Sequence, residues 1–214
     1  MFKKMEDDWN RKDYFAHYMN VLPTTFSTTV HLDITELYYE IKKRELKLYP
    51  VQIYLLARTV QTMKEFRTDE IDGTIGYWEI LHPSYTILNE KTKTFSSIWT
   101  PYQSDFSAFY SQCVSDIEIY KDSQKLFPQK NMPENVFNIS SLPWLEFTSF
   151  NLNVFIEGTY LKPIFTMGRL TKKNGKITIP LAIQVHHSTC DGYHVGKFVE
   201  EIKELIAAWP LWLD

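Results

Sequence analysis

Two adjacent histidines, His186 and His187, stand at the end of an apolar run and just before a helical pattern. Residues 177–183 are mostly aliphatic or β-branched, which favours a buried strand. After Gly192, apolar residues recur at spacings of three and four up to Ile206, which predicts an amphipathic helix. The histidines are therefore predicted to lie where a buried strand gives way to a loop and a helix, and a strand end holds a side chain firmly.

Adjacent residues of a strand point to opposite faces, so His186 and His187 cannot serve one site together. A histidine beside a strand is also more often a hydrogen-bonded core residue than a catalyst. A metal site is not predicted, because the chain has no HExxH pattern and neither Cys113 nor Cys190 belongs to a CxxC pair. The full string HHxxxDG at a strand-to-helix junction, with a carboxylate and a glycine behind the histidines, favours a functional site.

Periodicity along the chain predicts a mixed α and β fold. We expect helices over residues 9–19 (with Asp8 as a cap), 35–46, 50–66, 104–122 and 194–209. We expect strands over residues 25–33, in three short stretches between 74 and 100, over 145–155 and 163–170, and in the run that ends at the histidines. Asn174-Gly175 predicts a hairpin turn, and 121–138 a polar loop anchored by Phe127. The expected architecture is a sheet, mostly of late strands, covered by helices.

Composition narrows the class of protein. The 214 residues suffice for a large core, and we expect one domain over 1–214. A net charge of −3 without a basic stripe argues against a nucleic-acid partner. No apolar run is long enough for a membrane span, and residues 1–8 lack the apolar stretch of a signal peptide. Two cysteines suit a reducing compartment, so a cytoplasmic location is expected.

The string HHSTCDGYHV at 186–195 resembles the signature of the type A chloramphenicol acetyltransferases. HHxxxDG alone also occurs in the acyltransferase cores of 2-oxo acid dehydrogenase complexes. The combination with NISSLPW at 138–144 and SFNLN at 149–153 is more specific to the antibiotic-modifying enzymes. Further matching stretches are WNRKDYF at 9–15, Tyr49-Pro50 with Tyr54, LFP at 126–128 and PIFTM at 163–167.

The resemblance implies a fold, an activity and an assembly. The implied fold is a two-layer α/β sandwich of the CoA-dependent acyltransferase type, in the α+β class. The implied activity is acetyl-CoA-dependent O-acetylation of the 3-hydroxyl of chloramphenicol, which inactivates the antibiotic, by direct transfer in a ternary complex and without a metal. The implied assembly is a homotrimer with active sites at subunit interfaces.

The resemblance also assigns catalytic roles. His187 matches the general base, and a free imidazole, with a pKa of about 6.5, is largely neutral at pH 7. Ser140 matches the serine whose hydroxyl stabilises the tetrahedral oxyanion, although from spacing alone a local backbone bond would be the better interpretation. Thr166 matches a threonine that holds a water near the same oxyanion.

Asp191 allows two interpretations. It could stand behind His187 as the acid of a triad, or it could pair with Arg11 and hold the loop that carries His187. The resemblance favours the pair, because both partners match the family. Gly192 suits the turn that follows.

Substrate contacts are implied at further positions, although each of these side chains is, on sequence grounds alone, more commonly a core residue. Tyr18 would hydrogen-bond chloramphenicol, and an apolar wall would surround its rings and dichloroacetyl group. The wall residues are Phe95, Phe127 and Leu152. Thr24 stands where some relatives carry a cysteine that lines the pocket, and this departure bears on affinity rather than on chemistry. Tyr54 is a candidate contact for the adenine end of coenzyme A.

Two other functions were weighed. An acyltransferase core acting on dihydrolipoamide or another acceptor would normally carry lipoyl and subunit-binding segments upstream, and none is seen here. A non-enzymatic trimeric module that keeps the fold would be favoured if Ser140, His187 or Arg11 were absent, and all three are present.

Overall fold

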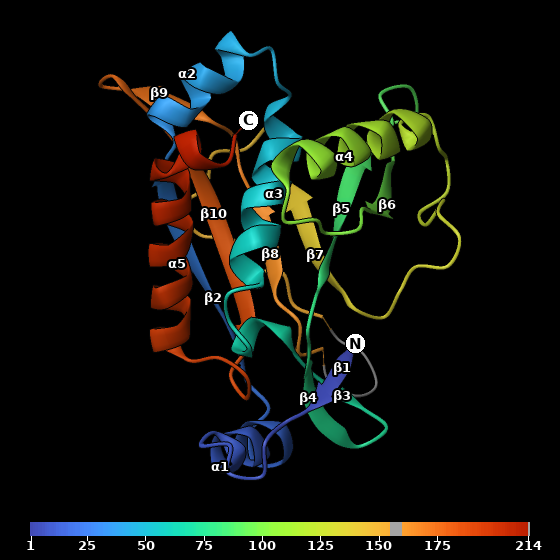
Figure 1. Cartoon of the computed structure of the whole chain (residues 1–214), viewed down its shortest axis with the longest axis vertical. Helices are drawn as coiled ribbons and strands as arrows, with labels where there is room; N and C mark the ends of the chain where they lie inside the picture. The colour runs from blue at the N-terminus through green and yellow to red at the C-terminus, as the bar shows by residue number, and fades with distance from the viewer. Residues whose placement is uncertain (155–159, 214) are drawn as a thin grey trace.

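The computed structural model describes residues 1–154 and 160–213. Its centre is a mixed seven-stranded sheet in the order β2-β10-β8-β7-β5-β6, with β9 paired to the first residues of β10 (Figure 1). The strands are β2 (Thr25–Asp33), β5 (His82–Leu88), β6 (Phe95–Trp99), β7 (Val136–Ser141), β8 (Ile164–Met167), β9 (Thr171–Lys173) and β10 (Lys176–His186). Strand β7 runs parallel to both β5 and β8, while the other pairs are antiparallel.

A second, antiparallel sheet of three strands lies near one end of the large sheet. It consists of β1 (Phe2–Lys4), β4 (Thr74–Trp78) and β3 (Thr68–Ile71), in that order. Its link to the large sheet includes an ion pair between Lys162 and Asp69, whose Nζ and Oδ2 are 2.6 Å apart. The indole Nε1–H of Trp78 donates to the same carboxylate oxygen at 2.9 Å.

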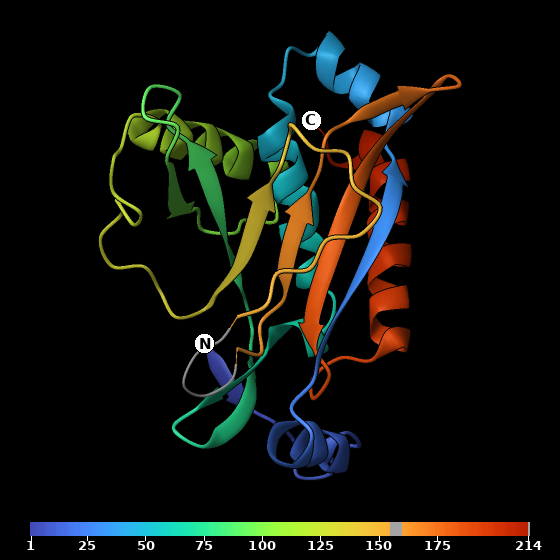
Figure 2. The same cartoon turned by 180° about the vertical axis from the view of Figure 1, so that it is seen from behind.

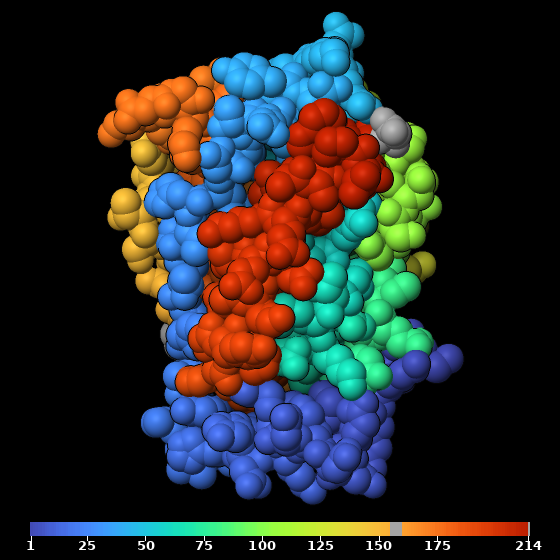
Figure 3. Space-filling model, turned by 60° about the vertical axis from the view of Figure 1, so that its left-hand side comes forward, coloured from blue at the N-terminus to red at the C-terminus, as the bar shows by residue number. Residues whose placement is uncertain are grey.

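Helices cover one face of the large sheet and leave most of the other without helices (Figures 1 and 2). The helices are α1 (Lys12–Ala16), which continues into a π-helical turn at His17–Val21, α2 (Thr35–Lys43), α3 (Leu48–Val60), α4 (Phe106–Tyr120) and α5 (Gly192–Ala207). Helix α3 packs against both α4 and α5. In Figure 3, α5 runs between β2 and α3, and the N-terminal segment closes the lower end. None of the helices in the described part of the chain has the length and apolarity that a membrane crossing requires.

Strand β10 shows how the two faces of the sheet differ. Its odd-numbered residues Leu181, Ile183 and Val185 belong to the hydrophobic core beneath the helices. Its even-numbered residues therefore face the other side, because successive side chains of a strand alternate. That side, the open face, carries polar groups such as Gln184 and His186, and the chain from 142 to 154 runs along it (Figure 2).

Several sequence predictions are confirmed. The α+β class holds, and the strand predicted at 25–33 has those bounds. The turn at Asn174-Gly175 joins β9 to β10 with φ values of +52° and +75°, which these two residues tolerate better than most. The final helix begins at Gly192 rather than His194, because the Asp191 side chain caps it by accepting the Tyr193 N–H.

Other predictions are wrong. Residues 145–154 form no strand, and Phe155 lies outside the described residues. Strand β7 instead begins inside the predicted loop 121–138 and lies between β5 and β8. Its Phe137 and Ile139 are buried and alternate with polar neighbours, which suits a strand in the middle of a sheet. Asp8 does not cap the first helix, whose N-cap is Arg11 without a side-chain bond. Phe127 does not anchor its loop, since 59% of it is exposed.

Candidate active site

His187 lies one residue beyond the end of β10. Its backbone N–H donates to the Thr24 carbonyl at 2.8 Å, which extends the β2–β10 pairing to the histidine itself. The imidazole stacks on the Tyr18 ring with centroids 4.0 Å apart and planes 12° from parallel. Phe26 meets the imidazole edge-on at 5.2 Å. Two aromatic rings and the strand backbone therefore restrict where this half-buried side chain can move.

The proton position on His187 follows from its neighbour. The Nδ1 atom lies 3.1 Å from the carbonyl oxygen of Cys190. A carbonyl can only accept a hydrogen bond, so the neutral ring carries its proton on Nδ1 and leaves the lone pair on Nε2. The loop of residues 187–190 thus holds its own histidine in the tautomer that a general base requires.

Arg11 and Asp191 hold this loop from the side. The Arg11 Nη1 donates to Asp191 Oδ2 at 2.6 Å, and Nη2 donates to the His187 carbonyl at 3.4 Å. Arg11 is only 7% exposed, and its Nε has no partner among the described residues. Because the Nδ1 of His187 is bonded to Cys190, the geometry matches the ion pair rather than a triad through Asp191.

Opposing effects act on the Asp191 carboxyl. Partial burial acts to raise its pKa, but the hydrogen bond from Arg11 and the positive charges nearby outweigh burial and leave the pKa below its usual value. The Oδ1 atom also lies 2.8 Å from Nδ1 of His194, whose Nε2 is 3.7 Å from Glu65. Asp191 therefore joins the start of α5, Arg11 and the His187 loop in one charged cluster.

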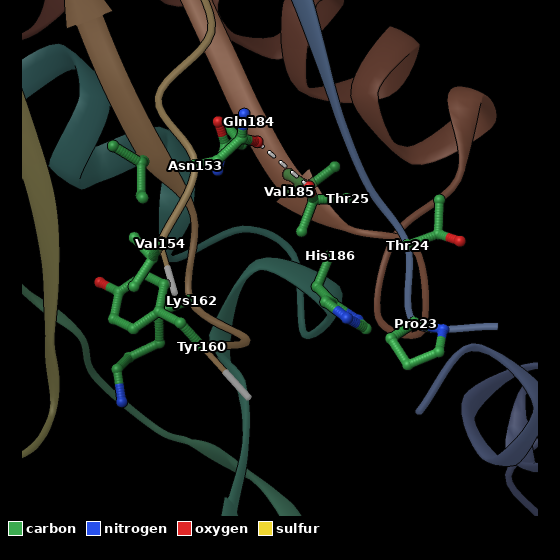
Figure 4. Close-up of a pocket in the computed structure, with 11 residues that line it drawn as sticks. Pro23, Thr24, Thr25, Asn153, Val154, Tyr160, Lys162, Gln184, Val185 and His186 are labelled. Atoms are coloured by element: carbon green, nitrogen blue, oxygen red, sulfur yellow. Dashed lines mark hydrogen bonds between the residues drawn. The ribbon is translucent and has the colours of Figure 1, made fainter. Parts of the chain in front are cut away.

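His186 points to the opposite side of β10. It is 4% exposed, and burial and the neighbouring His187 lower its pKa. Its Nδ1 accepts the Ser188 N–H at 3.2 Å and lies 2.6 Å from the Ser188 hydroxyl. His186 also lines a hollow of about 480 Å³ on the open face, shown in Figure 4, with Pro23, Thr24, Thr25, Asn153, Val154, Tyr160, Lys162, Ile164, Gln184 and Val185.

Ser140 and Thr166 lie side by side on the open face. They are register partners on β7 and β8, so their side chains share one side of the sheet. Their strand neighbours Ile139 and Phe165 fill the core on the other side. Thr166 is 2% exposed and Ser140 is half-buried.

Within one chain, Ser140 and His187 are far apart. Ser140 is level with Thr166, and Thr166 with Ala182, which precedes His187 by five residues. At about 3.3 Å per residue and about 4.8 Å between strands, their Cα atoms are about 19 Å apart. His187 is odd-numbered, like the core-facing residues of β10, and therefore lies on the helix side of the sheet, whereas Ser140 faces the open side. A single chain therefore does not bring the two side chains together.

The predicted acceptor wall is also not assembled around His187. Phe95, Phe127 and Leu152 are 56%, 59% and 42% exposed, respectively. Phe95 begins β6 at the sheet edge opposite β2, and the Leu126 carbonyl accepts the N–H of Ser97 on that strand. Thr24, by contrast, lines the hollow beside His186. The predicted site residues thus divide between two regions of the chain.

The prediction for Tyr54 requires correction. This residue is 0% exposed, and its hydroxyl donates to the Ser104 carbonyl at 2.7 Å. Its ring packs against Phe106, Phe109 and Trp212. A side chain without exposed surface offers no contact to the adenine of coenzyme A in this conformation.

Two contacts of His187 were not singled out from the sequence. The alternation over 25–33, which places Phe26 on the same side as buried Leu32, was the available signal for Phe26. No sequence pattern predicts that the Cys190 carbonyl lies beside the His187 ring. The Cys190 thiol is 1% exposed, and burial raises its pKa to about 12, which makes it a poor nucleophile. Within residues 1–154 and 160–213, no cluster of three or more His, Cys, Asp or Glu could hold a metal ion.

Known proteins resemble the chain over nearly its whole length. The family model described as chloramphenicol acetyltransferase matches residues 2–203. The chain is 56% identical to a chloramphenicol acetyltransferase of Bacillus pumilus, over 100% of this chain and 97% of the relative. It is 48% identical to one of Staphylococcus aureus, over 99% of each.

Solved structures share the fold. A chloramphenicol acetyltransferase superimposes with a TM-score of 0.86 at 20% identity, covering 96% of this chain and 100% of that one. The dihydrolipoamide acetyltransferase of Azotobacter vinelandii gives 0.70 at 15% identity, covering 89% and 84%. The family predicted from the HHSTCDGYHV signature is confirmed by the sequence relatives, and the fold by these structures. With a family model spanning residues 2–203 and relatives matched end to end, the chain belongs to the chloramphenicol acetyltransferase family.

Proposed function

We propose that this chain transfers the acetyl group of acetyl-CoA to the 3-hydroxyl of chloramphenicol and so inactivates the antibiotic. The observation that carries the proposal is the state of His187, whose Nδ1 is bonded to Cys190 O and whose ring is stacked on Tyr18. This arrangement leaves Nε2 with its lone pair for a substrate proton. Membership of the family supports the choice of substrates.

The chemistry proceeds in one ternary complex. Nε2 of His187 takes the proton of the 3-hydroxyl as its oxygen attacks the thioester carbon, a role typically worth about 10²–10⁴ in rate. The Ser140 hydroxyl donates to the oxyanion of the tetrahedral intermediate, and such a donor contributes about 10²–10³. Thr166, level with Ser140, holds a water near the same oxygen. Collapse breaks the carbon–sulfur bond, and the proton on His187 goes to the departing thiolate. No acyl-enzyme forms, because the acetyl group passes directly from the sulfur of coenzyme A to the oxygen of the substrate.

We further propose a homotrimer in which His187 of one subunit faces Ser140 of the next. The separation of about 19 Å within a chain, estimated from strand spacing, supports a shared site. The exposure of Phe95, Phe127 and Leu152 supports it as well, since an apolar acceptor wall needs a cover. Arg11 and Asp191 would then hold the base of one subunit in front of its neighbour's pocket.

The activity is tested with purified protein, acetyl-CoA, chloramphenicol and a thiol reagent. Thiol should be released only when chloramphenicol is present, and mass spectrometry should find the acetylated antibiotic. Dihydrolipoamide in place of chloramphenicol tests the alternative of a 2-oxo acid dehydrogenase type core. Absence of chloramphenicol-dependent thiol release would refute the proposed function.

The shared site needs its own experiment. His187→Ala and Ser140→Ala chains are made separately, and each is expected to be nearly inactive. When they are unfolded and refolded together, a mixed trimer contains one interface that joins an intact His187 to an intact Ser140, because interfaces of a cyclic trimer have a direction. Activity well above either parent is expected. A flat mixture beside a fully recovered wild-type control would refute the site between subunits.

We also propose that residues 1–214 form a single domain and that the protein works in the cytoplasm. Its two cysteines, Cys113 and Cys190, are free and buried, which suits a reducing compartment.

A further inference from the structure

The segment 149–153 lies on the open face without a strand partner, yet side chains of the sheet bind its backbone. The Phe150 N–H donates to the Thr29 hydroxyl at 3.3 Å, and the Leu152 N–H donates to Gln184 Oε1 at 3.0 Å. Thr29 belongs to β2 and Gln184 to β10. Alternate backbone N–H groups of the segment therefore donate to side chains of the sheet, rather than to the backbone of a neighbouring strand.

Gln184 is the better defined of these two supports. It is 7% exposed, and its Oε1 also accepts a hydrogen bond from the Ser27 hydroxyl at 3.3 Å. A carbonyl oxygen has two lone pairs, so both are occupied and the orientation of the amide is set. The side chain stands on β10, three residues before His187 but on the opposite face. Figure 4 shows it beside Asn153 in the wall of the hollow.

We propose that Gln184 is a positioning residue for the acceptor, because it fixes the backbone of Leu152 and thereby the apolar wall against which chloramphenicol packs. The inference rests on the proposed function. Loss of the support would shift Leu152 and leave His187 in place, since the histidine is held by Tyr18, Phe26 and Cys190 on the other face. The effect should therefore fall on the KM for chloramphenicol and spare the KM for acetyl-CoA.

Two substitutions separate hydrogen bonding from shape. Gln184→Met keeps the length of the side chain and removes the acceptor of both hydrogen bonds. It should raise the KM for chloramphenicol about five- to tenfold, as expected for loss of the one bond that holds the Leu152 backbone. Gln184→Glu keeps an oxygen for both donors, the Ser27 hydroxyl and the Leu152 N–H. This variant should stay within about threefold of wild type, since hydrogen bonds favour the charged form.

A matched control comes from Gln61. Its side chain bonds the carbonyls of Ala57 and Leu81 and the N–H of Leu81, and none of these partners belongs to the 149–153 segment. Gln61→Met should lower stability and leave the KM for chloramphenicol unchanged. If it raises that KM as much as Gln184→Met, the effect is a general loss of stability and the proposal fails.

A double-mutant cycle tests whether Gln184 acts through Leu152. Leu152→Ala should raise the KM for chloramphenicol, and adding Gln184→Met should then cost little more, because both changes disturb the same contact. Fully additive costs, an unchanged KM in Gln184→Met, or a Gln184→Glu variant as impaired as Gln184→Met would each overturn the inference. An inactive wild type would instead refute the proposed function, so the two failures are distinguishable.

Discussion

Replacing Asp191 by asparagine removes one charge from the cluster that holds the His187 loop. The carboxylate accepts from Arg11 Nη1 at 2.6 Å, and its other oxygen accepts the Tyr193 N–H at the start of α5. Arginine side chains stay charged in proteins, and Arg11 is only 7% exposed. It would therefore remain as a nearly buried charge without its counter-ion. Asparagine keeps an oxygen for the helix cap, whereas alanine removes both functions.

The magnitude follows from burial. Breaking a fully buried ion pair typically costs 3–5 kcal/mol, but the Asp191 side chain is 35% exposed and water screens it. We therefore expect Asp191→Asn to lower the free energy of unfolding by about 2 kcal/mol. Asp191→Ala should cost about 3 kcal/mol, because the lost cap adds about 1 kcal/mol. For a chain of this size, each kcal/mol corresponds to about 2–4 °C in Tm.

Denaturant and thermal unfolding followed by circular dichroism provide the assay, at one protein concentration throughout, because an oligomer's stability depends on concentration. Arg11→Met completes a double-mutant cycle with Asp191→Asn. The two costs should be non-additive by at least about 1 kcal/mol, since the first substitution already destroys the contact. Both single variants should also lose activity, because the Arg11 bond to the His187 carbonyl is part of the same cluster. Costs that add within about 0.5 kcal/mol would refute the pairing and return Asp191 to a triad.

Three further predictions concern the same site. The pKa of Asp191 is lowered from its ordinary value of 3.8, so its stabilising contribution is present above that pH and is lost as the pH falls through the folded value. The difference between wild type and Asp191→Asn in urea unfolding should therefore shrink from pH 7 to about pH 3, and a constant difference would contradict this assignment. His187→Ala should fold normally and lose about three orders of magnitude in kcat, and more than a tenth of wild-type activity would exclude His187 as the base. Tyr18→Phe should keep kcat, because stacking needs only the ring, and should raise the chloramphenicol KM, because it removes the hydroxyl proposed to hydrogen-bond the substrate. Tyr18→Ala should lower kcat about tenfold, and an unchanged KM in Tyr18→Phe would show that the hydroxyl does not bind the substrate.

Local pattern sufficed for several elements, whether their partners lie near in the sequence or far from it. The Asn174-Gly175 turn tolerates positive φ, so the β9–β10 hairpin follows from two residues. The alternation over 25–33 and the three- and four-residue spacing after Gly192 likewise predicted β2 and α5. The apolar run at 177–183, followed by the helical spacing, placed His187 at a strand end, where the structure has it.

Which of two similar stretches forms a strand could be seen only in the tertiary structure. Residues 136–141 and 145–154 both alternate apolar and polar side chains, but only the first lies between β5 and β8 and obtains backbone partners. The second is received by Thr29 and Gln184 side chains instead. Strand formation depends on which neighbour is within reach, and local periodicity does not contain that information.

Burial and register decided the rest. Tyr54 at a helix start looked available to a ligand, but α4 and the C-terminal turn enclose its ring. The tautomer of His187 depends on where the loop carries the Cys190 carbonyl. The distance between His187 and Ser140 depends on strand order, which no short stretch encodes. The sequence by itself determined which candidate side chains the chain offers for acetyl transfer, because residue type decides where an imidazole or a hydroxyl stands. Only the tertiary structure showed that one chain keeps two of them apart, because the register and the alternation of faces arise from long-range pairing.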